Sequence, residues 1–251
     1  VSTQYPDVKI VRNKRPNGFA GAVNSGILLA LEHGADFIAV CNNDIKVLPA
    51  WVSLTIALLR KDEKVGLVGF DEVLKEAEYF FYDWNPEDGV SSKSVARLPG
   101  CLYICSAEAI RRIGLFDEVY FMYGEDNDYF ARMIRAGYTL LQTNVPVWHF
   151  GEGSSGKNSF KTSWLAYRNA LRYAIKNEPP GGIIRMLLSI INQGCNPLFS
   201  KRFNDPNHNR LRRYNIAVNL GLFLGSCLWN LLNVVSTLRA RNQREDQLNQ
   251  R

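Results

Sequence analysis

The chain has 251 residues, of which 46% are hydrophobic, and this size fits one large α/β core with an additional segment. Its 30 lysines and arginines outnumber 24 aspartates and glutamates, which gives a formal net charge of +6, but no nucleic-acid-binding motif accompanies this charge, so a nucleic-acid partner is not expected. The five cysteines have neither C-x-x-C spacing nor paired histidines, and they predict reduced thiols in a cytoplasmic protein.

The chain begins with the pattern of a strand, a turn and a helix. Residues 8–11, with the sequence VKIV, are expected to form a short strand, and a turn rich in glycine and asparagine follows. Up to Gly34, hydrophobic residues then recur at helical spacing: Val23, Ile27, Ala30 and Leu31. This pattern predicts a helix that connects the first strand to a second one.

The second strand is a hydrophobic run that ends in three oxygen-bearing side chains. Residues 37–41, FIAVC, predict a strand buried on both faces, as in a parallel sheet, and such sheets bind ligands beyond the carboxyl ends of their strands. Asn42, Asn43 and Asp44 follow it, and carboxylate and amide oxygens are ligands that Mg²⁺ and Mn²⁺ accept. The alternative is a structural turn before a helix that begins near Pro49.

Further along, a cluster of acidic residues stands at the start of a predicted helix. Glu125, Asp126 and Asp128 precede residues 129–136, where they either carry chemistry or only stabilise the helix N-terminus. Arg132 either pairs with Asp128, four residues before it, or faces a phosphate group.

A strand-like segment from residue 138 leads to His149 and the sequence FGEGSS. A single histidine after a strand is more often structural than a ligand. The glycines and hydroxyls that follow can fold around phosphate groups, however, and they favour a metal-binding role for His149. Arg168, on a later helix, either binds a phosphate or covers the helix surface.

Five motifs follow one another along the chain: N-x-GFAGAVN-x-G, NND, G-x-L-Y-I, GLFDE-x-YFMYGED-x-D-x-x-R and V-x-HFGEGSS. Over about residues 8–169 they resemble the family 2 inverting glycosyltransferases of the GT-A fold, particularly the bacterial rhamnosyltransferase-like branch. The resemblance implies an α/β, Rossmann-like domain at residues 1–175, with a mostly parallel sheet flanked by helices, and a C-terminal helical extension at residues 176–251. It also implies that the family's first strand and nucleotide-base loop are missing from an N-terminally incomplete chain.

The resemblance assigns roles to individual residues. Asn42, Asn43 and Asp44 stand at the family's Asp-x-Asp metal motif, where Asn42 replaces the first aspartate and leaves Asp44 as the principal anionic ligand. His149 completes the site for Mg²⁺ or Mn²⁺, and Asp126 is the catalytic base, with Glu125 and Asp128 next in line. The other predicted site residues bind the donor and its phosphates (Asn13, Asn17, Gly18, Asn24, Asn43, Gly153, Ser154, Arg132 and Arg168) or the acceptor (Trp84 and Gly100).

The positive charge of the chain lies in its C-terminal part. From residue 196 onward nine lysines and arginines stand against three acids, a balance of +6 that equals the charge of the whole chain. Residues 215–238 are uncharged, with arginines on both sides. Their asparagines make a transmembrane helix a poor fit, and we expect an interfacial helix at an anionic membrane surface. The alternative is a helix packed on the catalytic core or on a second subunit.

Together these patterns predict a metal-dependent inverting glycosyltransferase that is cytoplasmic and peripheral at the inner face of the plasma membrane. The expected donor is a dTDP- or UDP-linked sugar such as rhamnose, and the expected acceptor is a hydroxyl of a cell-surface polysaccharide or of a lipid-linked glycan. Two alternatives stay open. A sugar-phosphate nucleotidyltransferase would need a glycine-rich basic signature that these residues lack, and a catalytically inactive glycan-binding or assembly protein would fit Asn42.

Overall fold

The computed structural model describes residues 4–80, 82, 84, 89–150, 160–195 and 214–249. The chain divides into two units, Val1–Gly151 and Glu152–Arg251. The expected boundary at residue 175 falls inside a helix, α6 (Phe160–Asn177), which belongs to the second unit. The two units are therefore described separately.

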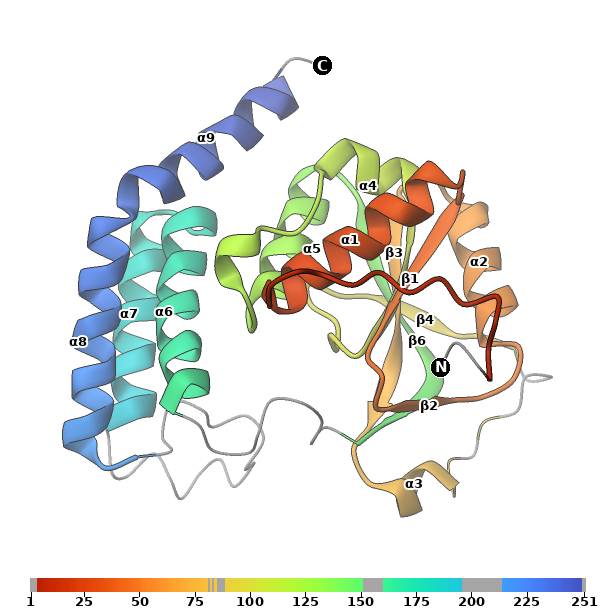
Figure 1. Ribbon diagram of the computed structural model, residues 1–251, viewed down its shortest axis with the longest axis horizontal. Helices are drawn as coiled ribbons and strands as arrows, with labels where there is room; N and C mark the ends of the chain where they lie inside the picture. Colours follow the sequence, from red (N-terminus) through yellow and green to blue (C-terminus); the bar gives the residue numbers. More distant parts are fainter. Residues whose placement is uncertain are drawn as a thin grey trace. The chain divides into compact units, whose positions relative to one another are not determined.

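Within the described residues, the first unit is built on a six-stranded sheet with the order β1-β5-β3-β6-β2, and β4 also pairs with β6 (Figure 1). The strands are β1 (Phe37–Cys41), β2 (Ile45–Val47), β3 (Val65–Val73), β4 (Ser92–Ser94), β5 (Leu102–Ser106) and β6 (Thr139–His149). Because helices flank this sheet, the expected α/β class is confirmed.

The expectation of a mostly parallel sheet is wrong, because among the described pairings only that of β3 with β6 is parallel. β5 lies between β1 and β3 and runs opposite to both. The chain enters β5 from the short strand β4, without the crossover helix that a parallel neighbour would need.

Helices cover both faces of the sheet: α1 (Gly18–Glu32), α2 (Trp51–Lys61), α3 (Glu76–Phe80), α4 (Ala107–Ile113) and α5 (Glu125–Arg135). Alternate residues of β5 point to opposite faces. Leu102 and Ile104 pack in one cluster with Leu59 of α2. Tyr103 meets Phe130 of α5, with ring centroids 5.5 Å apart. Figure 1 accordingly shows α2 on one side of the sheet and α1, α4 and α5 on the other.

Two expectations for the N-terminal part are wrong. Residues 8–11 form no strand and are exposed. In addition, β1 is not buried on both faces, because Ile38 and Val40 are buried whereas Ala39 and Cys41 are exposed. In the described sheet β1 is an edge strand that pairs with β5 alone, and residues 8–11 add no strand to its other edge.

The second unit is helical, as expected for the C-terminal region, with α6, α7 (Pro180–Cys195), α8 (Ile216–Leu232) and α9 (Val234–Asn249). Its apolar centre includes Tyr167, Leu171 and Phe223. The uncharged stretch is not one helix, since α8 ends at Leu232. No single described helix has the length and hydropathy to cross a bilayer, whereas α8 together with α9 up to residue 242 passes that test as a pair bent by 61°.

Candidate active site

The predicted metal-site residues meet where β2 and β6 pair. Ile45 lies opposite His149 in this antiparallel pair, which brings the preceding residue, Asp44, next to the imidazole. His149 Nε2 lies 3.4 Å from Asp44 Oδ1 and 3.2 Å from Nδ2 of Asn42. A rotation of the Asn42 amide would present its oxygen at the same place. One carboxylate, one amide and one imidazole therefore converge on a small volume at the end of the sheet.

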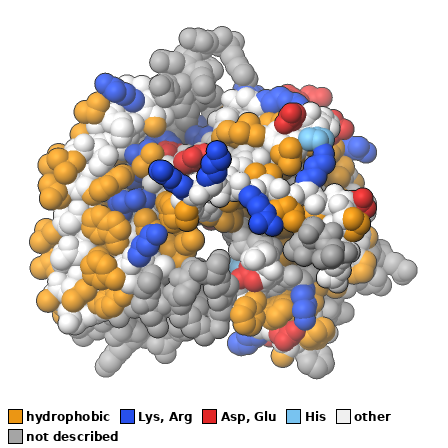
Figure 2. Space-filling model, in the orientation of Figure 1, with side chains coloured by type: hydrophobic (Ala, Val, Ile, Leu, Met, Phe, Trp, Pro, Cys, Tyr) orange, Lys and Arg blue, Asp and Glu red, His pale blue; other side chains and the backbone are white. Residues whose placement is uncertain are grey.

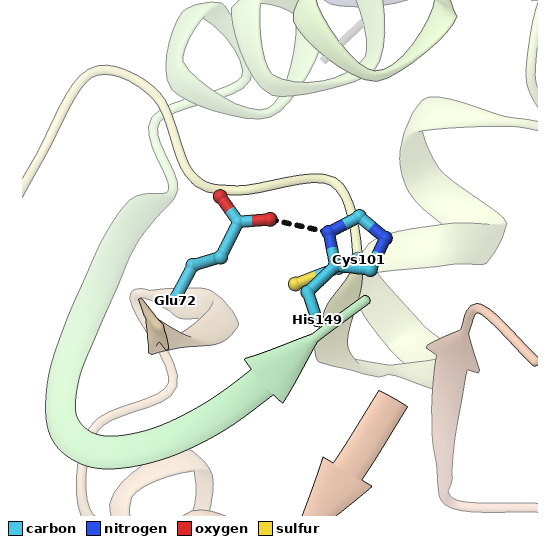
Figure 3. Close-up of side chains that lie close together, drawn as sticks. All are labelled: Glu72, Cys101 and His149. Carbon is cyan, nitrogen blue, oxygen red and sulfur yellow. Dashed lines mark hydrogen bonds and ion pairs between the residues drawn. The ribbon is translucent and has the colours of Figure 1, made fainter. Parts of the chain in front are cut away.

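Glu72, at the end of β3, holds the other side of the imidazole (Figure 3). Its Oε1 lies 2.5 Å from His149 Nδ1. Metal-binding histidines commonly donate their second ring N–H to a carboxylate, which fixes the orientation of the ring. Glu72 thus turns Nε2 toward Asp44. Burial alone would lower the pKa of His149, but the hydrogen bond and charge of Glu72, followed by those of Asp44, outweigh it and raise that pKa.

Cys101 offers an alternative set of ligands. Its Sγ, a Glu72 oxygen and a His149 nitrogen all lie within 4.8 Å of one another, and Figure 3 shows the three side chains. The thiolate is the form that binds metals. Burial, and then the Glu72 carboxylate, raise the pKa of the Cys101 thiol, which favours the neutral form. The set of Asp44, Asn42 and His149 is consequently the better cation site.

Asp126 is connected to the candidate cation site by contacts with the backbone at Gly100 and Cys101. Its Oδ1 accepts a hydrogen bond from the Asn127 amide at 2.7 Å. Its Oδ2 lies over Gly100, where a Cβ would approach it to 2.6 Å. The backbone oxygen of the next residue, Cys101, accepts a hydrogen bond from the backbone N–H of Asn42 at 2.8 Å. Gly100 and Cys101 therefore separate the carboxylate of Asp126 from the backbone of Asn42, at one end of the candidate cation site.

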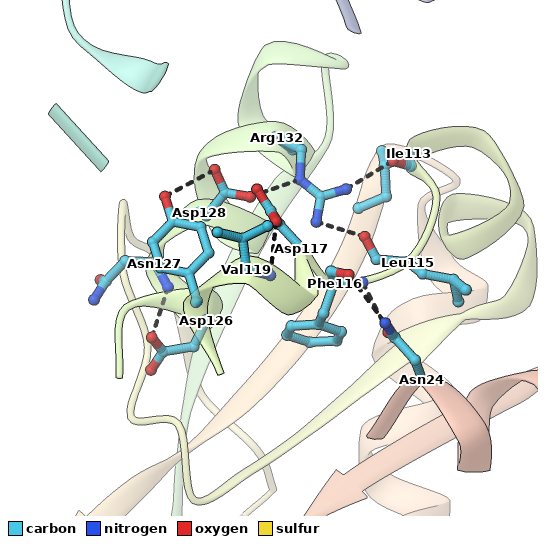
Figure 4. A network of polar contacts seen from close by, with 11 residues as sticks. Asn24, Ile113, Leu115, Phe116, Asp117, Val119, Asp126, Asn127, Asp128 and Arg132 are labelled. Carbon is cyan, nitrogen blue, oxygen red and sulfur yellow. Dashed lines mark hydrogen bonds and ion pairs between the residues drawn. The ribbon is translucent and has the colours of Figure 1, made fainter. Parts of the chain in front are cut away.

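The roles predicted for Asp128 and Arg132 need correction (Figure 4). Asp128 is 0% exposed and Arg132 is 8% exposed, and Nε of Arg132 lies 3.1 Å from Oδ2 of Asp128. Arg132 also donates to the backbone oxygens of Ile113 at 2.8 Å and Leu115 at 2.7 Å. The pairing alternative is thus confirmed. Because the Asp128 carboxylate and the Arg132 guanidinium are buried and bonded within the protein, Asp128 is a poor base and Arg132 a poor phosphate ligand.

Asn24, predicted to bind the donor, is a structural residue as well. Its Nδ2 donates to the Phe116 oxygen at 3.0 Å, and its Oδ1 accepts from the Phe116 amide at 2.9 Å (Figure 4). Its Nδ2 also donates to Glu118 Oε1 at 2.9 Å. The buried amide of Asn24 is thereby fully engaged, which leaves no group to hold a phosphate.

Gly18, also predicted to bind the donor, permits a close approach of two backbone segments. It has a φ of +72°, and a Cβ there would lie 2.1 Å from the Phe121 oxygen. That oxygen accepts a hydrogen bond from the Phe19 amide at 2.7 Å. Gly18 and Asn24 thus fasten the GFAGAVN motif to the GLFDE-x-YF motif.

The remaining predicted residues of the first unit are less constrained. Asn13 and Asn17 hydrogen-bond to each other at 3.3 Å before α1, and Asn43 is exposed beside the cation site. Glu125 is buried under the first turn of α5, which disfavours it as a base for an external substrate. Trp84, predicted to bind the acceptor, is partly buried against the core cluster that contains Leu102 and Ile104.

Three predicted residues lie beyond this unit or outside its described part. Gly153 and Ser154 lie outside the described residues. Arg168 belongs to the second unit, where its guanidinium stacks over the Trp229 ring at 4.8 Å from the centroid and its Nε donates to Asn169 Oδ1 at 2.8 Å. In these contacts Arg168 covers the helix surface, which is the second of the two alternatives predicted for it.

Two solved structures share the fold of the chain at low sequence identity. One is GalNAc-T7 with UDP, GalNAc and Mn²⁺, with a TM-score of 0.51 and 15% identity over 70% of this chain and 37% of that chain. The other is the mannosyltransferase PcManGT from Pyrobaculum calidifontis in complex with GDP-Man and Mn²⁺, with a TM-score of 0.50 and 15% identity over 99% of this chain and 70% of that chain. The chain thus spans little more than a third of GalNAc-T7.

These similarities, with the mixed sheet and its flanking helices, define a GT-A fold. Residues 1–120 match the family model Glycosyl transferase family 2. A comparison with curated proteins found no matching sequence.

Proposed function

We propose that the protein is a metal-dependent inverting glycosyltransferase that uses a nucleotide-diphosphate sugar. The observation that carries the proposal is the convergence of Asp44, Asn42 and His149, with Asp126 separated from the backbone of Asn42 by Gly100 and Cys101. The family match of residues 1–120 and the nucleotides and Mn²⁺ bound in the two similar proteins support it.

The donor atoms suit Mg²⁺ or Mn²⁺, since carboxylate and amide oxygens are hard ligands and imidazole is accepted by transition metals. Asp44 would supply the one charged ligand, His149 Nε2 and the Asn42 oxygen the neutral ones, and Glu72 would keep the imidazole in place. Bound there, the cation supplies positive charge against the diphosphate that leaves the sugar.

Asp126 performs the proton transfer in this proposal. The acceptor hydroxyl oxygen forms a bond to the anomeric carbon as the bond from that carbon to the diphosphate oxygen breaks, and a carboxylate oxygen of Asp126 takes the hydroxyl proton. Attack from the face opposite the diphosphate inverts the anomeric centre in one displacement. The hydrogen bond from Asn127 holds one carboxylate oxygen of Asp126 and leaves the other over Gly100.

The finer part of the proposal concerns the substrates. We infer a dTDP- or UDP-linked donor, with rhamnose as the sugar, and a hydroxyl of a polysaccharide or of a lipid-linked glycan as the acceptor, at the cytoplasmic face of the membrane. The order of the five motifs, which resembles that of rhamnosyltransferase-like proteins, supports this choice.

The test is a panel of nucleotide sugars, dTDP-rhamnose, UDP-GalNAc and GDP-mannose among them, offered to the purified protein with acceptor glycans, with Mn²⁺ or with EDTA. Sugar transfer that requires the cation and inverts the anomeric centre is the expected result. Donor and cation binding without any transfer would favour a non-catalytic glycan-binding protein, which the uncharged Asn42 suits. Formation of a nucleotide sugar from a nucleoside triphosphate would identify a nucleotidyltransferase.

A further inference from the structure

Helix α8 buries polar residues together with Leu222 and Phe223, and it exposes a row of other large apolar residues. Asn219, Ser226 and Asn230 are buried against the rest of the second unit. On the opposite side of the helix an exposed apolar row consists of Ile216, Leu220, Leu224, Leu228 and Leu231. Figure 2 shows hydrophobic side chains over the outer side of α8. A helix of a water-soluble bundle does not normally expose such a row of large apolar side chains.

The hydrogen bond from Asn230 to Arg168 joins the inner side of α8 to α6. Nδ2 of Asn230 donates to the Arg168 oxygen at 3.0 Å and to the Ser226 oxygen at 2.9 Å, and Nδ2 of Asn219 donates to the Tyr214 oxygen at 2.8 Å. The side-chain nitrogens of Asn219 and Asn230 are therefore paired inside the unit, while the row from Ile216 to Leu231 faces outward. Isolated exposed leucines are ordinary, but a continuous row of them marks an interaction surface.

The row is continued on the neighbouring helices. α7 packs against α8 and exposes Ile184, Leu188 and Ile191 at the spacing of one helical face. After the bend at Asn233, α9 exposes Val235 and Leu238. We call the exposed apolar residues of α7, α8 and the start of α9 the outer apolar face.

We propose that the outer apolar face lies in the interfacial region of an anionic lipid membrane, with α8 parallel to the membrane plane. The distribution of charge around α8 indicates that the partner of this face is lipid. Residues 215–238 carry no charge, and nine basic residues from position 196 onward stand on both sides of them. Arg241 donates to the backbone oxygens of Ile175 and Glu178, and the other eight suit anionic headgroups. The 61° bend after α8 fits a helix pair that lies on a membrane better than a single straight span. This inference goes beyond the proposed function, because it concerns a surface outside the candidate active site.

The test is flotation of the full chain with vesicles. Vesicles of phosphatidylcholine and phosphatidylglycerol in a 3:1 ratio should bind the protein, while vesicles of phosphatidylcholine alone, or added salt, should weaken binding because the basic flanks lose their attraction. The variant Leu224→Glu/Leu228→Glu should lower the partition coefficient by about tenfold or more. It replaces two leucines that the membrane would cover with two charged side chains.

The matched control is Leu28→Glu/Ile134→Glu on the first unit, where these side chains are 54% and 41% exposed, against 58% and 57% for Leu224 and Leu228. It should bind vesicles like the unchanged protein. If the glutamate variant of α8 loses its helical circular dichroism, Leu224→Gln/Leu228→Gln replaces it and should weaken binding in the same direction.

Equal flotation of the folded α8 variant and the unchanged protein would overturn the proposal. So would an unchanged protein that binds neither kind of vesicle but sediments as a dimer that the α8 variant dissociates, because the face would then join two copies of the chain. Both outcomes are independent of sugar transfer, so they leave the proposed function to its own test.

Discussion

The two nitrogens of His149 have different partners, and this division determines what the imidazole can bind. Nδ1 faces Glu72 at 2.5 Å, whereas Nε2 faces Asp44 at 3.4 Å. A histidine whose proton is held at Nδ1 by a carboxylate presents a lone pair at Nε2. Glu72 is therefore a positioning residue for the cation site, although it comes from a different strand.

The first prediction is that Glu72→Gln weakens Mn²⁺ binding by about 10- to 100-fold, the usual cost of losing such a partner. Isothermal titration of Mn²⁺ into the protein without donor measures it, and Glu78→Gln, which removes an exposed acid beside Lys75, is the control. Cys101→Ser should have little effect. Loss of Mn²⁺ binding in Cys101→Ser together with normal binding in Asp44→Ala would instead assign the cation to Glu72, Cys101 and His149.

The second prediction concerns Asp126. Asp126→Asn keeps the size of the side chain but removes the base, so turnover should fall by about 10²- to 10⁴-fold while donor binding, measured by titration, stays nearly unchanged. A loss of only a few-fold would move the base to another acid, with Glu125 the next candidate. Asp44→Ala should show the opposite division and weaken donor binding in the presence of Mn²⁺.

The third prediction uses the contact between Gly100 and Asp126. Gly100→Ala would put a methyl group 2.6 Å from Oδ2 of Asp126, so the carboxylate must move, and turnover should fall by about tenfold or more with little loss of fold stability. Gly26→Ala is the matched control, since an added Cβ at Gly26 in α1 meets nothing within 4 Å. Normal turnover in Gly100→Ala would show that the position of this carboxylate is not critical.

Part of the site could be predicted from local pattern and part could not. Asn42, Asp44 and His149 are polar residues placed directly at strand ends, which the sequence makes visible. Glu72 depends on the parallel pairing of β3 with β6, in which it lies beside Val147, and pairing between strands so far apart in sequence leaves no local signature. The only signal was an acidic residue at the end of an apolar run.

At the scale of single elements, the start of α5 serves two purposes within one turn. Asp126 is partly exposed at the first turn, while Asp128 two residues later is buried and paired with Arg132. Arg132 links α5 to the segment after α4 through the carbonyls of Ile113 and Leu115. This pairing fixes the helix that carries the proposed base.

The fourth prediction is that Asp128→Ala destabilises the first unit by about 3–5 kcal/mol, because it leaves the buried guanidinium of Arg132 without a counter-charge. Thermal or urea unfolding measures it. Glu78→Gln, which removes the exposed partner of Lys75, should leave the unfolding midpoint nearly unchanged, because solvent screens exposed ion pairs. An unchanged unfolding midpoint with a large loss of turnover would make Asp128 the base after all.

The helices were more predictable than the sheet. The hydrophobic spacing from Val23 to Leu31 and the stop at Gly34 correspond to α1, because a helix is closed by bonds between near neighbours. Strand direction and the absence of a strand at residues 8–11 depend on which strands lie next to one another. Those choices are made across 60 residues or more between β1 and β5, beyond the reach of local periodicity.

At the scale of the whole molecule, the basic charge and the candidate active site belong to different units. The first unit contains the candidate cation site and Asp126, whereas the basic excess of the chain and the outer apolar face belong to the second. Substitutions on α8 and substitutions around His149 should therefore change membrane binding and sugar transfer separately when both are measured on the same preparation.

The exposed apolar row of α8 also bears on how the second unit selects one packing. A rotation of the helix by half a turn would hide its leucines from water, and the hydrophobic effect alone would favour it. Such a rotation would break the hydrogen bond from Asn230 to the Arg168 oxygen, take the buried amide of Asn219 out of the unit, and bring Leu222 and Phe223 to the surface. These asparagines thus specify which face of α8 is buried, as a single buried asparagine specifies the register of a coiled coil.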